Sequence, residues 1–178
     1  MLSLERINEI KKIIKDNNLI NKSLMQIAEE NNIIIKNWKL DNLTDDNVSL
    51  SGAIFKAEEN KYAIFINEND SEYRQRFTIA HELWHFFLHK DILDKVDTII
   101  DRKESQYLYR NTDFEEINEE TRWMEEEANE FAWNLLMPEE KFLELYKKYT
   151  IPQLSQIFSV SERAISTRFY YLSKRYDK

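Results

Sequence analysis

The sequence contains no cysteine, one glycine and two prolines among its 178 residues. The absence of cysteine excludes disulfide bonds, a thiol nucleophile and thiolate metal ligands. With Gly52 as the only glycine, neither a P-loop nor a dinucleotide-binding fingerprint can form. Sandwiches and barrels need many tight turns, so this composition favours a fold dominated by helices.

Long apolar runs and excess positive charge are also missing. No apolar run approaches the length of a membrane span, and residues 1–6 lack the core of a signal peptide. The net charge of −8 argues against nucleic acid as the main partner, because phosphate binding needs clustered basic residues. With 42% hydrophobic residues, the chain can bury a sizeable core. We expect a cytoplasmic protein that forms a single domain over residues 1–178 and does not associate with membranes.

Hydrophobic periodicity predicts a mostly helical α+β protein with a small antiparallel sheet. Cap residues and helical spacing predict helices over residues 4–17, 23–28, 70–90, 115–137, 139–149, 152–158 and 161–174. Runs of β-branched and aromatic residues predict strands at 33–38, 53–55 and 62–66, the last two joined as a hairpin. Residues 41–47 are typical of a loop, and 91–112 have no clear pattern.

All three histidines lie within nine residues, on the predicted helix at 70–90. His81, Glu82 and His85 form an H-E-x-x-H motif, which places the two histidines one turn apart on the same helix face. Two imidazole nitrogens at this spacing can reach one zinc ion, with Glu82 beside them to carry a proton. The helix is apolar almost all round, so we expect it in the middle of the domain. The alternative is a core helix whose histidines only satisfy hydrogen bonds.

Catalytic zinc normally takes three protein ligands, so a third ligand is needed. His89 lies one turn beyond His85, but three ligands along two turns of a straight helix cannot converge on one ion. We expect His89 to be a partly exposed residue near the end of the helix, close to the last carbonyl groups.

A carboxylate on the helix at 115–137 is the better candidate. Helical phase places Glu125 on a face lined by small residues, where a second helix can approach closely. Glu127 points to the opposite side, and Glu126 lies between the two. The predicted metal ligands are therefore His81, His85 and Glu125. Asn129, one turn beyond Glu125, is placed to hydrogen-bond one of the ligands.

These ligands predict metal-assisted hydrolysis of an amide with one Zn²⁺ ion as cofactor. Glu82 would act as general base towards water and then as general acid towards the leaving amine. A further group must stabilise the oxyanion, and Tyr107, Tyr109 and Arg110 are candidates among which the sequence does not choose.

The C-terminal residues 150–178 have the spacing of a helix-turn-helix. The second helix would carry Arg163 and Arg168, as a recognition helix would. The acidic balance of the chain favours a different interpretation, a helical pair that completes the domain or docks a protein substrate.

Two sequence blocks, 76–89 and 125–138, resemble the ImmA/IrrE family of metallopeptidases. The first contains the H-E-x-x-H motif, and the second contains Glu-Glu-Glu-Ala-Asn-Glu-Phe-Ala and ends in Leu-Leu-Met-Pro. The resemblance covers about residues 20 to 175 and implies a zincin-like fold with zinc held by His81, His85 and Glu125. It also implies a protein substrate in a bacterium or phage, a helix-turn-helix repressor of a mobile element or stress response.

Trp84 departs from the family pattern, which usually has glycine at this position. We expect its indole to narrow the substrate cleft. Two other functions stay open at this stage. One is a non-catalytic zincin-like module that binds or senses a partner, and the other is a DNA-binding regulator that uses the C-terminal helices.

Overall fold

The computed structural model describes residues 2–39, 50–96, 98–102 and 119–176. The elements within these residues are α1 Leu4–Asp16, α2 Leu24–Glu30, β1 Ile33–Trp38, β2 Leu50–Glu58, β3 Lys61–Asn67, α3 Glu72–Val96, β4 Thr98–Arg102, α4 Glu119–Leu136, α5 Glu139–Tyr146, α6 Ile151–Phe158 and α7 Glu162–Tyr176. The predicted mostly helical α+β class is confirmed. The loop predicted at 41–47 lies outside the described residues. No helix in the described ranges is long and apolar enough to cross a membrane.

The strands form one sheet in the order β1-β3-β2-β4. β2 and β3 make the predicted antiparallel hairpin, and Asn60 in its turn adopts a left-handed backbone with φ 59°. β4 pairs antiparallel with the other side of β2. β4 lies in the stretch 91–112, where the sequence predicts no element, although its Thr98-Ile99-Ile100 run has the β-branched residues typical of a strand.

The predicted all-antiparallel sheet is wrong for its first strand. β1 runs parallel to β3, with Ile33 opposite Tyr62 and Ile35 opposite Ile64. Parallel neighbours need a crossover of a dozen or more residues, and the stretch that contains β2 provides that length here. The sheet is therefore mixed.

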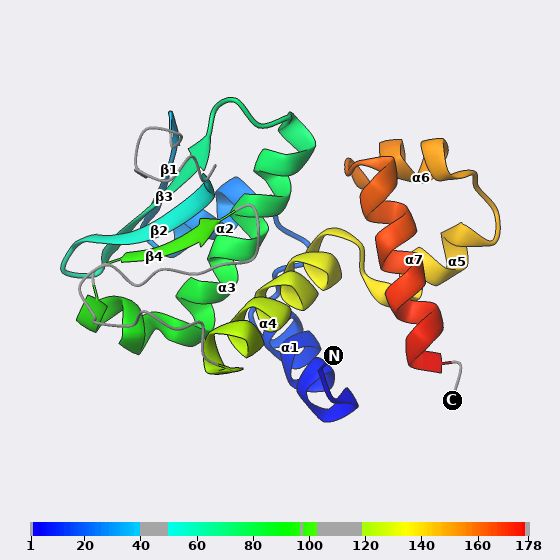
Figure 1. The fold of residues 1–178 in the computed structure, drawn as a ribbon, viewed down its shortest axis with the longest axis horizontal. Coiled ribbons are helices and arrows are strands. Elements are labelled where there is room, and N and C mark those ends of the chain that lie inside the picture. Colours follow the sequence, from blue (N-terminus) through cyan, green and yellow to red (C-terminus); the bar gives the residue numbers. More distant parts are fainter. Residues whose placement is uncertain (1, 40–49, 97, 103–118, 177–178) are drawn as a thin grey trace.

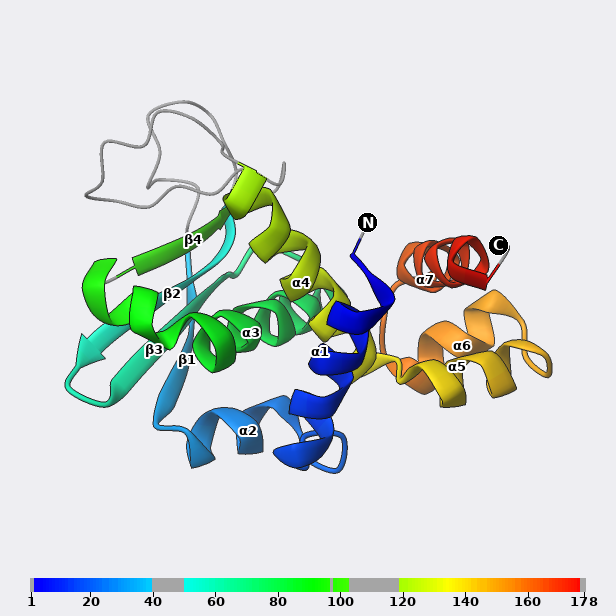
Figure 2. The ribbon, with the colours of Figure 1, turned by 90° about the horizontal axis from the view of Figure 1, so that it is seen from below.

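α3 packs against β2 and β3, and α4 lies beside α3 with α1 against it (Figures 1 and 2). Ile54 of β2 and Ile64 of β3 are fully buried, and the ring of Tyr62 meets Phe86 of α3 edge-on at 5.0 Å. Helices α5, α6 and α7 form a separate group at the far end of α4. The sheet and α4 thus hold α3 in the centre of the larger part of the molecule.

The starts of α3 and α7 carry serine caps, as expected. The hydroxyl of Ser71 accepts the backbone N–H of Arg74 at the start of α3, and Ser161 accepts that of Ala164 in α7. Pro138 stands at the N-cap of α5, one position before the helix. α3 continues to Val96 rather than ending near residue 90, because the chain kinks at His89 and then resumes as a helix.

The only glycine of the sequence, Gly52, lies where β2 passes close to α3. A Cβ atom on Gly52 would lie 2.3 Å from Cγ2 of Thr78 and 3.2 Å from the backbone oxygen of Phe65. It would also lie 3.2 Å from Oε1 of Glu82. Thr78 is fully buried, so it has little room to move aside. Gly52 is needed for this close approach of backbone to helix.

We therefore expect Gly52→Ala to lower the free energy of unfolding by about 1–3 kcal/mol through overpacking. The matched control is Gly52→Ala combined with Thr78→Ser, which removes the clashing methyl group and should recover much of the loss. Urea unfolding of the three proteins measures both effects. An unchanged stability in the single variant would contradict the close packing.

Candidate metal centre

His81 and His85 lie one turn apart on α3, and the Nε2 atoms of their rings face each other. Their Nε2 atoms lie 3.3 Å apart, and both side chains are buried. The helix places them there because residues four apart share a face. Burial between the sheet and α4 fixes both rings, as a site of defined geometry requires.

Glu125 reaches the same point from α4. Its Oε1 lies 3.2 Å from Nε2 of His81 and 3.5 Å from Nε2 of His85. Ala128 and Ala132 on the same side of α4 are fully buried, which lets α4 approach α3 closely. The structure thus brings together the three residues that the sequence pattern selected, and their donor atoms lie within 4.8 Å of one another.

This donor group fits a single metal ion. Ligands about 2.0–2.1 Å from a tetrahedral zinc ion lie roughly 3.3 Å from one another. The observed separations of 3.3, 3.2 and 3.5 Å match that spacing before any ion is added. Two imidazoles and one carboxylate are also a donor set that catalytic zinc uses, with a fourth position left for water or substrate. His81, His85 and Glu125 can therefore hold one metal ion.

The protonation states suit the same role. Burial lowers the pKa of His85, so that imidazole is neutral at pH 7. Burial alone would raise the pKa of Glu125, but the two neighbouring histidines outweigh it and lower the pKa to about 2. A neutral imidazole and an ionised carboxylate are the forms that bind a metal ion.

Asn129 contacts His81 on the Nδ1 side of the ring, away from the donor group. Its Oδ1 lies 3.3 Å from Nδ1 of His81, on the opposite edge of the ring from Glu125. A histidine that offers Nε2 to a metal carries its proton on Nδ1, and Oδ1 of Asn129 can accept it. This is the contact expected from the position of Asn129 on α4.

Glu82 is fully buried on α3, next to β2. One carboxylate oxygen would lie 3.2 Å from a Cβ atom added to Gly52, so the carboxylate is close to the backbone of β2. Glu82 is not one of the three grouped ligands. The oxyanion candidates Tyr107, Tyr109 and Arg110 lie outside the described residues.

Glu127 is held by α1 instead of by the histidines. Its two oxygens accept hydrogen bonds from Nε and an Nη atom of Arg6 at 2.6 and 2.8 Å. This pairing faces away from Glu125, as the helical phase predicted, and it ties α1 to α4. The guanidinium of Arg6 also lies 5.9 Å from the ring centre of Trp84.

Two expectations for α3 are corrected. His89 is 8% exposed instead of partly exposed, because the kink turns its ring inwards against His85. Burial, with the nearby positive charge of Arg6 among smaller causes, lowers the pKa of His89 to about 3. Trp84 is fully buried, with its ring 5.1 Å from that of Phe131. Its indole is core packing between α3 and α4 and does not line an open cleft.

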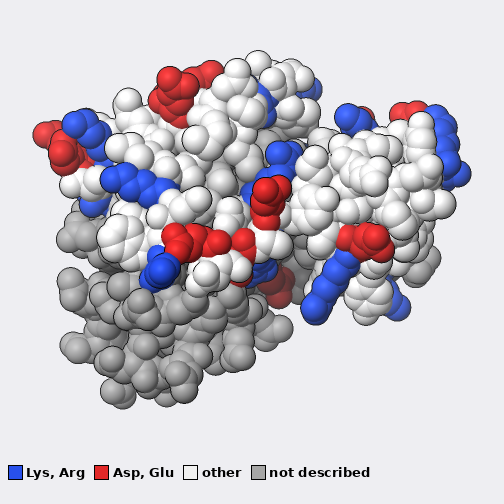
Figure 3. Space-filling model, turned by 90° about the horizontal axis from the view of Figure 1, so that it is seen from above, with Lys and Arg blue, Asp and Glu red and all other residues white. Residues whose placement is uncertain are grey.

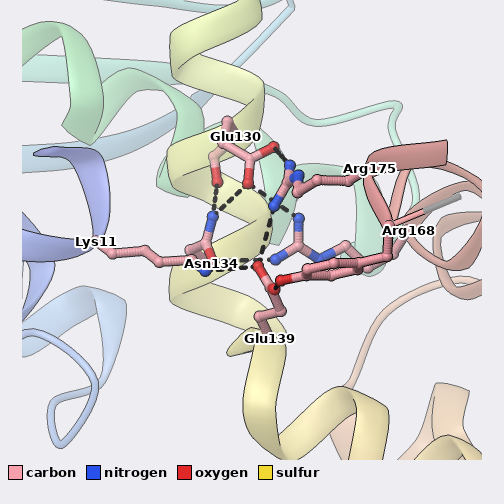
Figure 4. Close-up of polar contacts among 7 residues, drawn as sticks. Lys11, Glu130, Asn134, Glu139, Arg168 and Arg175 are labelled. Atoms are coloured by element: carbon pink, nitrogen blue, oxygen red, sulfur yellow. Dashed lines mark hydrogen bonds and ion pairs between the residues drawn. The ribbon is translucent and has the colours of Figure 1, made fainter. Parts of the chain in front are cut away.

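The C-terminal helices are joined to α4 by a buried network of charged groups (Figure 4). Arg168 of α7 donates to Glu130 at 3.2 Å and to Asn134 at 3.0 Å. Arg175 donates to Glu130 at 2.9 Å and to Glu139 at 3.0 Å. The network extends to Lys11 of α1 and to the hydroxyl of Tyr176, both of which contact Glu139.

This network argues against the alternative in which Arg168 belongs to a DNA-reading surface, and it agrees with the favoured interpretation of a packed helical pair. Arg168 is fully buried and paired with α4, while Arg163 remains exposed. On the face shown in Figure 3, the basic side chains of the described residues are interspersed with acidic ones. A surface of mixed sign does not favour phosphate binding.

We expect Arg168→Met to lower the free energy of unfolding by about 3 kcal/mol, because it leaves Glu130 buried with one partner fewer. The control Arg163→Met removes the same charge from an exposed position and should change stability by less than about 0.5 kcal/mol. Thermal unfolding distinguishes the two. Equal losses would mean that the network does not hold α7 to α4.

Comparison with known proteins agrees with this site. A family model, Peptidase_M78, described as the IrrE N-terminal-like domain, matches residues 42–170. No curated protein matches the chain. A solved structure of a Mycobacterium tuberculosis transcriptional regulator is similar, with 17% sequence identity and a TM-score of 0.48. The match covers 92% of this chain and 51% of the regulator, so the chain spans about half of that protein's length.

Proposed function

Because the chain belongs to the Peptidase_M78 family of IrrE N-terminal-like domains, we propose that it is a cytoplasmic zinc-dependent endopeptidase. The observation that carries this proposal is the buried group of His81, His85 and Glu125, whose donor atoms already have the spacing of zinc ligands. A core helix with merely satisfied histidines has no need of one carboxylate oxygen within 3.5 Å of both rings.

A zinc ion held by these residues would supply Lewis-acid polarisation of water and of the scissile carbonyl. Glu82 accepts a proton from the attacking water as the water oxygen bonds to the carbonyl carbon. When the carbon–nitrogen bond breaks, Glu82 passes that proton to the leaving amine. Asn129 keeps the ring of His81 in one orientation throughout.

We propose a regulatory protein as substrate, a helix-turn-helix repressor of a mobile element or stress response. The support is the likeness of the two blocks around His81 and Glu125 to the ImmA/IrrE metallopeptidases. Residues 1–178 then act as one metallopeptidase domain. The helices in 150–178 would complete that domain, since Arg168 and Arg175 bind them to α4, or would dock the protein substrate.

The test is cleavage of a helix-turn-helix repressor encoded beside this chain's gene. We expect two fragments by mass spectrometry, no fragments after treatment with a chelator, and renewed cleavage once zinc is added back. The chelated sample is the control for contaminating proteases that need no metal. An intact repressor in the presence of stoichiometric zinc would contradict the substrate, and cleavage that survives the chelator would contradict the mechanism.

A further inference from the structure

Among the described residues, His89 contacts the donor group at His85, on the edge of the His85 ring that faces away from His81. Its Nδ1 lies 3.1 Å from Nδ1 of His85, whereas Nε2 of His85 faces His81 at 3.3 Å. The two nitrogens are on opposite edges of the His85 ring. His89 is therefore outside the group of three donors but in direct contact with one of them.

The hydrogen-bond direction follows from the valence of the imidazole. When His85 offers the lone pair of Nε2 to a metal ion, its remaining proton sits on Nδ1. This buried N–H needs an acceptor, because an unmade hydrogen bond in the interior costs about 1–3 kcal/mol. Nδ1 of His89 is within hydrogen-bonding distance, so it accepts the bond and His89 carries its own proton on Nε2.

The surrounding structure fixes His89 in this place. A straight helix continues through each residue with helical dihedrals, but His89 departs from them with φ −115° and ψ 24°. Its ring is buried and meets the fully buried indole of Trp84 edge-on, at 6.3 Å and an interplanar angle of 89°. The kink and the indole together hold the ring against His85.

We propose that His89 is a positioning residue that sets the tautomer and the orientation of His85. Each histidine of the donor group then has one acceptor on its Nδ1, Asn129 for His81 at 3.3 Å and His89 for His85 at 3.1 Å. Such contacts typically tune metal affinity 10- to 100-fold. The inference rests on the proposed function, because it requires His85 to bind a metal ion.

The test compares His89→Asn with His89→Gln. The Asn side chain can place its oxygen where Nδ1 of His89 stands, whereas the amide of Gln lies one carbon farther out, near the place of Nε2. Both variants keep a polar amide in the same cavity. We expect the zinc dissociation constant of the Asn variant to stay within about threefold of wild type, and that of the Gln variant to rise about 10- to 100-fold.

Competition with a chromophoric chelator at fixed pH measures the zinc dissociation constants, and thermal unfolding of the metal-free proteins checks that each variant folds. His89→Leu, which has no acceptor, should bind zinc as weakly as the Gln variant. Wild-type affinity in the Gln and Leu variants would overturn the role of His89, as would equal weakening in Asn and Gln. Failure of the wild-type protein to bind zinc would instead overturn the proposed function.

Discussion

Glu82→Gln is expected to abolish peptide hydrolysis while one zinc ion per chain remains bound. Gln has nearly the same shape as Glu but cannot accept a proton from water, so general base catalysis is lost. This contribution is typically worth about 10²- to 10⁴-fold in rate. The ligand group of His81, His85 and Glu125 is untouched, so metal content should not change. Initial rates of repressor cleavage and elemental analysis of the purified protein measure the two quantities.

Glu82→Asp is the matched control, because it keeps the charge and withdraws the carboxylate by one methylene group. A displacement of about 1 Å can cost 10²-fold in rate, so we expect a reduced but measurable activity. Full activity in Glu82→Gln would show that Glu82 is not the base. A wild-type protein that binds its partner tightly and is as inactive as Glu82→Gln would favour the non-catalytic binding module.

The local part of this site could be predicted from the sequence because a helix has a fixed period. The spacing of four between His81 and His85 determines that they share a face wherever the helix lies. The same period distinguishes Glu125 from Glu127 on α4 without any knowledge of what α4 packs against. The helix caps at Ser71 and Ser161 could also be predicted from the sequence, since each is a hydrogen bond between residues three apart.

The features that were missed depend on contacts between distant parts of the chain. The parallel pairing of β1 with β3 is a choice between strands that no local pattern encodes. Arg168 is buried because Glu130 and Asn134, more than thirty residues earlier, accept its hydrogen bonds. The kink at His89 interrupts a helix that was predicted to run straight to residue 90. The prediction that His89 is partly exposed assumed a straight helix, and the kink makes that assumption wrong.

Glu125→Ala is expected to weaken zinc binding by about 100-fold or more, since removing a ligand should cost at least as much as removing its hydrogen-bonding partner. It deletes the only carboxylate in the donor group and leaves two histidines from a single helix. Cleavage should fall with the metal content and recover in part when zinc is supplied in excess. Metal per chain after gel filtration, and the dissociation constant from chelator competition, measure the loss.

Glu127→Ala is the control, because it removes an equal charge two residues along the same helix. Glu127 pairs with Arg6 of α1, so its loss should lower the free energy of unfolding by on the order of 1 kcal/mol and leave zinc affinity unchanged. The opposite result, zinc lost from Glu127→Ala and kept by Glu125→Ala, would overturn the ligand assignment. The two variants thus distinguish a metal ligand, Glu125, from a residue in a structural ion pair, Glu127. Composition alone cannot make this distinction, because both residues are glutamates in the same acidic run.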